Sequence, residues 1–200
     1  MEKYVITIAR QFGSLGRPVA RKMAEILGIQ YYDRDIVEET SKELNVPVSA
    51  VSEVEESVKN NFFYMKFPLG INTTVEQDKL FRTQQMIIRS LAEKESCIVV
   101  GRCSDYVLRD YENHLSIYIF APYEARMKNC IENLNMEEKV AKKMIADVDR
   151  ARDLYHMHYA GYLPGDVNYK NVLIDSSLLG VDGTAEFLAE LARKKFGLDA

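Results

Sequence analysis

The sequence has few cysteines, glycines and prolines, and these shortages already narrow the kind of protein it can encode. Its three cysteines are odd in number and show no Cys-x-x-Cys spacing, which argues against a disulfide framework and a structural zinc site. Ten glycines and five prolines, with 47% hydrophobic residues, exclude collagen-like, low-complexity and wholly disordered chains. We therefore expect a globular protein with reduced, mostly buried thiols at Cys97, Cys103 and Cys130.

A strong charge and a long apolar run are also missing. Lys and Arg number 26 against 30 Asp and Glu, so the net charge is −4, too mildly acidic for general binding to nucleic acid or to anionic membranes. No apolar run approaches the roughly 18 residues of a membrane span, and the first residues form no signal-like apolar core. We expect a cytoplasmic protein without nucleic-acid or membrane partners, in which a local site holds any anionic ligand.

Short β-branched segments alternate with amphipathic helical patterns along the 200 residues, a length typical of one domain. Strands are expected at residues 4–9, 29–32, 97–100, 115–120 and 172–174. Helices are expected at residues 17–27, 33–44, 48–59, 75–93, 122–134, 137–159 and 184–196. Because such connections are crossovers, the sequence predicts a doubly wound α/β fold with a mostly parallel five-stranded sheet covered on both faces.

One segment, residues 60–74, fits neither the helical nor the strand period. It combines aromatic residues such as Phe62, Phe63 and Phe67 with Pro68 and Gly70. Exposed aromatic side chains in an irregular segment indicate a substrate lid or the contact of a homodimer. A loop folded onto the core explains the same pattern equally well.

The turn after the first predicted strand carries the clearest chemical signal. In a parallel α/β sheet, ligands bind beyond the carboxyl ends of the strands, and the first strand-to-helix turn is the favoured place for phosphate. Gly13 and Gly16 let backbone N–H groups approach an anion at the start of the following helix, and Arg17 can add a bidentate contact. The whole turn reads Gln11-Phe12-Gly13-Ser14-Leu15-Gly16-Arg17-Pro18.

This turn departs from the phosphate-loop motif Gly-x-x-x-x-Gly-Lys-[Ser/Thr]. Gln11 stands at the first glycine position, Arg17 at the lysine position, and Pro18 at the position of the hydroxyl residue that would hold magnesium. On these residues alone, an anion site and a plain glycine turn with an exposed arginine are equally supported.

Four segments taken together resemble the cytidylate kinase-like family. They are Ile6-Thr-Ile-Ala-Arg-Gln-Phe-Gly-Ser-Leu-Gly-Arg-Pro, Tyr31-Tyr-Asp-Arg-Asp-Ile, Ile98-Val-Val-Gly-Arg-Cys-Ser-Asp-Tyr-Val-Leu, and Asn168-Tyr with Leu173-Ile-Asp-Ser-Ser. The resemblance implies a three-layer fold of the P-loop NTPase type in a single domain, residues 1–200, with a helical monophosphate-binding insertion at residues 33–75 and a helical lid at residues 135–165. It also implies transfer of the γ-phosphoryl group of ATP, with Mg²⁺, to CMP, dCMP or a related monophosphate.

The resemblance assigns roles to individual residues. The ATP phosphates would be held by Gly13, Ser14, Leu15, Gly16, Arg17 and Pro18. The monophosphate would be bound by Asp33 and Arg102, and by Gln84, whose amide on an apolar helix face needs a buried partner. The catalytic group would comprise Arg17, Arg102, Arg152 and Asp149, with Asp149 orienting Arg152. No metal ligands are predicted among the protein's side chains.

Each of these assignments has a structural alternative. Asp33 can cap the following helix, and Arg102 can form a surface ion pair. Asp149 and Arg152, three residues apart, can be a solvated ion pair on one helix. Tyr155 and Tyr159 are expected to pack the lid helix, and the histidines show no triad or metal spacing.

Two functions remain after this comparison. The first is a kinase for a pyrimidine monophosphate, which the loop glycines and the separate arginines favour. The second is a nucleotide- or phosphate-binding protein with weak or no turnover, which the missing loop lysine and hydroxyl favour. An oligomeric interaction module that uses the aromatic segment is a third class.

Overall fold

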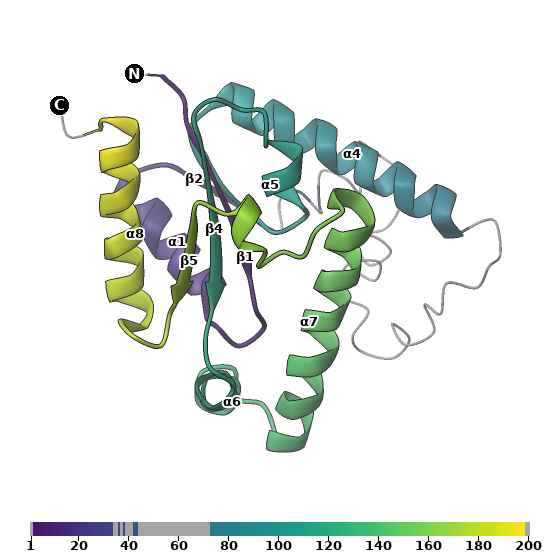
Figure 1. Cartoon of the computed structure of the whole chain (residues 1–200), viewed down its shortest axis with the longest axis vertical. Helices are drawn as coiled ribbons and strands as arrows, with labels where there is room; N and C mark the ends of the chain where they lie inside the picture. Colours follow the sequence, from purple (N-terminus) through teal and green to yellow (C-terminus); the bar gives the residue numbers. More distant parts are fainter. Residues whose placement is uncertain (1, 34–35, 37, 39–41, 44–72, 199–200) are drawn as a thin grey trace.

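A computed structural model places a five-stranded parallel sheet at the centre of the chain (Figure 1). It describes residues 2–33, 36, 38, 42–43 and 73–198. The strand order is β2-β3-β1-β4-β5, and every pairing is parallel. The strands are β1 Val5–Arg10, β2 Gln30–Tyr32, β3 Cys97–Val100, β4 His114–Phe120 and β5 Val172–Asp175. The predicted α/β class and the predicted five strands are confirmed.

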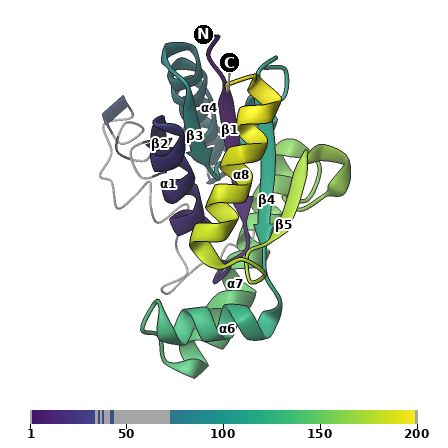
Figure 2. The ribbon, with the colours of Figure 1, turned by 90° about the vertical axis from the view of Figure 1, so that its left-hand side faces the viewer.

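Helices cover both faces of this sheet, which gives three layers. On one face, α1 and α8 lie side by side (Figure 2), and on the other lie α4 and α5. The N-terminal half of α7 and the whole of α6 lie beyond the carboxyl ends of the strands (Figure 1). The helices are α1 Gly16–Leu27, α4 Thr73–Lys94, α5 Ser104–Val107, α6 Tyr123–Glu132, α7 Glu138–Ala160 and α8 Gly180–Phe196, with a 3₁₀ turn at Val167–Tyr169.

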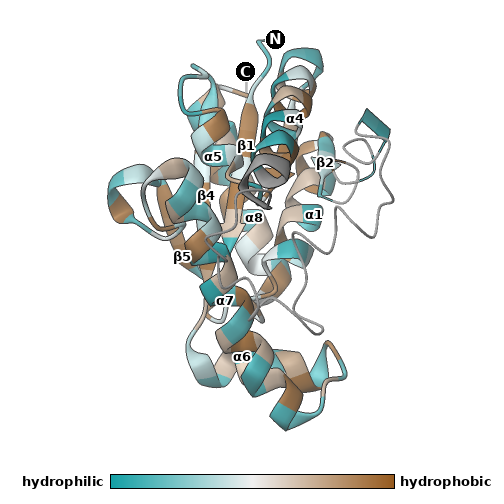
Figure 3. Cartoon of the chain, turned by 90° about the vertical axis from the view of Figure 1, so that its right-hand side faces the viewer, coloured by the Kyte–Doolittle hydropathy of each residue, from teal (hydrophilic) through white to brown (hydrophobic). Residues whose placement is uncertain are grey.

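The alternation of side chains along β1 explains how one strand serves two cores. Ile6 and Ile8 belong to the core under α1 and α8, whereas Val5 belongs to the core under α4. Figure 3 shows β1 largely in hydrophobic colours, while the helices carry hydrophobic and hydrophilic stretches. A parallel strand buried on both faces has this nearly continuous apolar character. The core therefore holds the carboxyl ends of β1 and β3 rigidly next to each other.

Most predicted elements are confirmed to within a few residues. The clearest difference is α8, which begins at Gly180 and not at residue 184. The short helix α5 and the 3₁₀ turn were not predicted, because four or three residues are too few for a helical period to show. The predicted helix at 48–59, most of the predicted helix at 33–44 and the aromatic residues 60–72 lie outside the described residues. The division into a monophosphate-binding insertion and a lid stays a prediction.

Two further expectations are tested by the structure. All three cysteines are buried and free, as predicted, and burial raises the pKa of the Cys97 thiol to about 12. Within the described residues, no helix is long and apolar enough to cross a membrane.

Candidate active site

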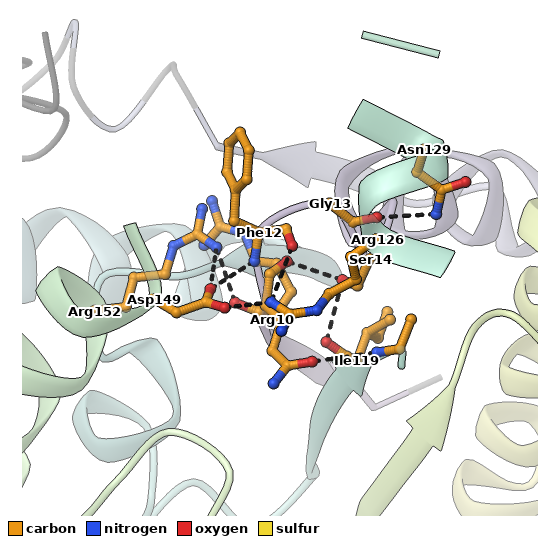
Figure 4. Close-up of polar contacts among 11 residues, drawn as sticks. Arg10, Phe12, Gly13, Ser14, Ile119, Arg126, Asn129, Asp149 and Arg152 are labelled. Carbon is orange, nitrogen blue, oxygen red and sulfur yellow. Dashed lines mark hydrogen bonds and ion pairs between the residues drawn. The ribbon is translucent and has the colours of Figure 1, made fainter. Parts of the chain in front are cut away.

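The loop between β1 and α1 is held in place by hydrogen bonds to its carbonyl groups. Four successive carbonyl oxygens of the loop accept hydrogen bonds from side chains, three of which come from other segments. Figure 4 shows Arg126 and Asn129 next to the loop. The donors are Ser14 Oγ to Gln11 O at 2.9 Å, Arg126 Nη1 to Phe12 O at 3.3 Å, Asn129 Nδ2 to Gly13 O at 2.9 Å, and Ser176 Oγ to Ser14 O at 2.6 Å. Residues from α6 and from the β5–α8 connection thus fix the loop's shape.

The backbone N–H groups of Gly13, Ser14, Leu15 and Gly16 have no acceptor among the described residues. Positive φ angles at Gly13 (78°) and Leu15 (55°) curl this stretch into the N-terminus of α1. Consecutive free amides at a helix N-terminus form a concavity that suits an anion. The loop has the backbone geometry that the phosphate-site interpretation requires.

Three of the predicted residues meet next to this loop. Arg17 Nε lies 2.7 Å from Asp33 Oδ2, and Arg102 Nη2 donates to the backbone carbonyl of Asp33 at 3.4 Å. Asp33 follows β2, Arg17 begins α1, and Arg102 follows β3, so three separate segments contribute to one cluster. Arg17 is therefore ion-paired at a side-chain exposure of 39%, and Arg102 reaches the backbone carbonyl of the same acid.

The backbone at Arg102 is itself unusual. Gly101, Arg102 and Cys103 have consecutive positive φ angles of 78°, 60° and 50°. Left-handed conformations of residues other than glycine are costly, and they concentrate at functional sites. The turn aims Arg102 toward Asp33 at the carboxyl end of the sheet.

Arg10, the last residue of β1, joins this cluster and was not predicted as a site residue. Its side chain is 11% exposed, and its Nη2 lies 4.0 Å from Asp33 Oδ1. Burial lowers the pKa of Arg10 well below its ordinary value, and the positive charges of Arg152, Arg17 and Arg102 lower it further. Its position in the sequence could have identified it, because Arg10 ends a buried strand at the same edge of the sheet as Arg102.

The helix α7 brings Arg152 to the cluster, as the resemblance implied. Arg152 Nη1 donates to the backbone carbonyl of Arg10 at 3.0 Å. Burial is the largest cause of a lowered pKa of the Arg152 guanidinium. Arg10 and Arg17 thus face the Asp33 carboxylate, Arg102 contacts the Asp33 backbone carbonyl, and Arg152 contacts the backbone of Arg10. We call these four arginines the arginine cluster.

The shortest contacts of Asp149 are to Phe12 and Arg126, whereas Arg152 was the predicted partner. Its nearest partners are the backbone N–H of Phe12, which donates to Oδ1 at 2.7 Å, and Arg126, which pairs with Oδ2. Its distance to Arg152 Nη1 is 3.9 Å. Asp149 therefore ties α7 and α6 to the phosphate loop (Figure 4), and orienting Arg152 is at most a minor part of its role.

Gln84 is fully buried on α4, as its place on an apolar face predicted. Its Oε1 accepts a hydrogen bond from the Tyr155 hydroxyl at 3.2 Å. Tyr155 and Tyr159 of α7 pack against Phe81 of α4, with the Tyr159 and Phe81 rings stacked at 3.8 Å. The expected packing role of the two tyrosines is confirmed, and the Gln84 amide has a partner within the protein.

A second buried polar cluster lies at the C-terminal end of α7. His156 places Nδ1 2.8 Å from Tyr162 O and Nε2 3.0 Å from Asp105 Oδ1. Lys170 and the Tyr162 hydroxyl also bond the Asp105 carboxylate. Burial alone would raise the pKa of Asp105, but the hydrogen bond from His156 and the charge of Lys170 hold it below its ordinary value. The spacing of these residues in the sequence gave no sign of the cluster.

The side chains at the loop do not supply the usual magnesium ligands of a phosphate loop. Pro18 has no hydroxyl, and the Ser14 hydroxyl donates to Gln11 O. In the described part of the chain, no group of three or more His, Cys, Asp or Glu residues is arranged to hold a metal ion. The described side chains therefore do not form a site for a resident metal ion.

One family model matches most of the chain. The model of the Cytidylate kinase-like family matches residues 5–178. The chain belongs to the cytidylate kinase-like family. The match covers the phosphate loop, the arginine cluster and all five strands, so the site lies within the part of the chain that defines this family. No curated protein matches the sequence.

Solved structures show which folds this chain resembles. An uncharacterized protein from Eubacterium ventriosum is 27% identical with a TM-score of 0.69, and the match covers 95% of this chain and 98% of that one. A shikimate kinase from Bacteroides thetaiotaomicron is 8% identical with a TM-score of 0.54, covering 94% and 97%. A gluconokinase from Sinorhizobium meliloti is 14% identical with a TM-score of 0.53, covering 98% of both chains. The likeness to the two kinases shows a shared fold.

Proposed function

We propose that this protein is a nucleoside monophosphate kinase that transfers the γ-phosphoryl group of ATP to CMP, dCMP or a related monophosphate. The observation that carries the proposal is the meeting of the free loop amides with the arginine cluster at the carboxyl ends of β1 and β3. Family membership supports the class of reaction.

The proposed mechanism follows from the positions of these groups. Phosphoryl transfer needs little covalent chemistry from the protein, so catalysis consists of alignment and of positive charge around a dispersed anionic transition state. The amides of Gly13 to Gly16 would hold the donor phosphates. Arg102, on the neighbouring loop, would hold the acceptor phosphate through its planar guanidinium. Arg152 would approach from α7 and stabilise charge on the donor side.

A second candidate is a nucleotide-binding protein that does not turn over. The observation that favours it is the engagement of Arg17, at the position of the loop lysine, with Asp33 at 2.7 Å. A loop whose cation is already paired and which lacks the magnesium-binding hydroxyl can bind phosphates through its amides without accelerating their transfer.

One assay separates the two candidates. Purified protein is incubated with ATP, Mg²⁺ and separately CMP, dCMP, UMP or AMP, and ADP formation is followed together with ATP binding by calorimetry. A monophosphate kinase gives ADP formation that depends on the acceptor, and one acceptor is preferred. ATP binding without acceptor-dependent ADP formation supports the non-catalytic candidate. Absence of ATP binding in folded protein contradicts both.

A further inference from the structure

The arginine cluster has one member whose surroundings are those of a ligand-binding cation. Arg10 is buried, and its only charged contact among the described residues is Asp33 at 4.0 Å. Its Nε is buried and has no hydrogen-bond partner there. A buried polar group normally finds a partner, since leaving it unpaired costs free energy. The protein therefore keeps a buried cation with one long ion pair and with hydrogen-bonding capacity that the described residues leave unused.

Two glycines provide the space that this side chain occupies. A Cβ atom built on Gly16 would lie 2.7 Å from Arg10 Cβ, and one built on Gly101 would lie 2.3 Å from Arg10 Nη1. Gly16 belongs to the phosphate loop, and Gly101 directly precedes Arg102. The Arg10 side chain thus starts against the loop proposed for the donor phosphates and ends over the turn proposed for the acceptor phosphate.

Arg17 does not have this position. It stands where the motif places lysine, but its side chain is 39% exposed and its Nε lies 2.7 Å from Asp33. Arg10 lies between the two phosphate-binding elements, is 11% exposed and is less fully paired. The charge that a loop lysine would bring to the transferred group is therefore available from the strand end instead of the loop.

We infer that Arg10 is a catalytic residue that contacts the phosphoryl group in transit between donor and acceptor, in place of the missing loop lysine. This inference rests on the proposed function and names a residue for it. The fork of the guanidinium suits two oxygens of a phosphoryl group, and a charge placed between donor and acceptor stabilises the transition state more than either bound substrate.

The test compares Arg10→Met, Arg10→Lys and the control Arg109→Met. Arg109 is an exposed arginine near Asp110, before β4, and its replacement removes the same charge far from the site. Arg10→Met should lower kcat by roughly 10²–10³-fold while the KM values change less than tenfold, because the contact is strongest in the transition state. Arg10→Lys should recover part of kcat, since it restores charge without the fork. A kcat of Arg10→Met equal to that of Arg109→Met would overturn the inference.

Thermal stability separates catalysis from a structural role. Arg10 is buried beside three other arginines, so its charge opposes folding, and a Met of similar length removes that cost. Without ligand, Arg10→Met should unfold at the same temperature as the wild type or about 2–4 °C higher. If the unfolding temperature of Arg10→Met falls so far that the variant is partly unfolded at the assay temperature, the inference is overturned and Arg10 is a structural residue.

Failure of the proposed function is recognised independently. If the wild-type protein forms no ADP with any acceptor, the kinase proposal fails, and Arg10 is then tested by ATP binding alone. Arg10→Met should weaken ATP binding measurably, though less than tenfold, relative to Arg109→Met, since the Arg10 side chain starts against the loop proposed for the donor phosphates. Equal ATP binding by the two variants would overturn the assignment of Arg10 to the phosphate site.

Discussion

The guanidinium Nε of Arg17 lies 2.7 Å from the carboxylate of Asp33, which is only 7% exposed. The residue at the position of the phosphate-loop lysine is therefore engaged by an acid before any substrate arrives. A phosphate group that approaches the loop competes with Asp33 for the same cation, and it also meets the repulsion of the carboxylate. We expect Asp33 to act as a counter-ion that stabilises the arginine cluster and weakens anion binding.

Replacing Asp33 by Asn should reveal this competition. The Asp33→Asn variant should bind inorganic tripolyphosphate about tenfold more tightly, because Arg17 no longer has a charged partner, and lose roughly 1–3 kcal/mol of unfolding free energy. Calorimetry measures the affinity and urea unfolding the stability. Asp182→Asn is the matched control, since Asp182 pairs with Lys22 at 3.6 Å on the exposed surface. Equal or weaker tripolyphosphate binding by Asp33→Asn would contradict the counter-ion role.

Arg102→Ala tests the acceptor side of the site. The side chain follows a left-handed turn and reaches the Asp33 carbonyl, so its removal leaves the core untouched. We expect the KM for the monophosphate to rise about 10–100-fold, because a hydrogen bond to a charged group contributes a binding free energy of that size. ATP affinity should change less than threefold. Steady-state kinetics with varied acceptor measures the first quantity. A large loss of ATP affinity instead would place Arg102 on the donor side.

The sequence predicted the fold and the main site elements because both depend on local patterns. Continuous apolar strands, amphipathic helices and the Gly13–Gly16 turn are visible within a few neighbouring residues. Arg17, Arg102 and Arg152 were found because each matches a family segment. The sequence did not predict that Arg17 pairs with Asp33, or that the Arg10 side chain packs against Gly16 and Gly101. Both contacts depend on how separate strand ends face each other. The cluster of Asp105, His156 and Lys170 joins residues 51 and 65 positions apart.

Asp149→Asn tests the loop rather than the chemistry. Asp149 accepts the Phe12 N–H at 2.7 Å and pairs with Arg126, whose side chain also bonds the Phe12 carbonyl. Loss of the charge should loosen the loop, so ATP affinity should fall about three- to tenfold, and kcat should fall in the variant by no more than a similar factor. A collapse of kcat with unchanged ATP binding would show instead that Asp149 orients Arg152 for the reaction, as the family resemblance implied.

Asp105 should make the stability of the protein sensitive to acid, through the buried polar cluster at the C-terminal end of α7. Because the folded pKa of Asp105 is lower than its unfolded value of about 3.9, its charge stabilises the folded protein above that value. This contribution is lost as the pH falls from about 5 through the folded pKa, when the carboxylate is protonated. Asp105→Asn should lose about 3–5 kcal/mol at pH 7, since Lys170 and His156 stay buried without their acid. Urea unfolding from pH 7 to pH 3 measures both effects: the wild-type curve should fall toward the variant's at low pH, whereas parallel curves would show that Asp105 does not carry the acid sensitivity.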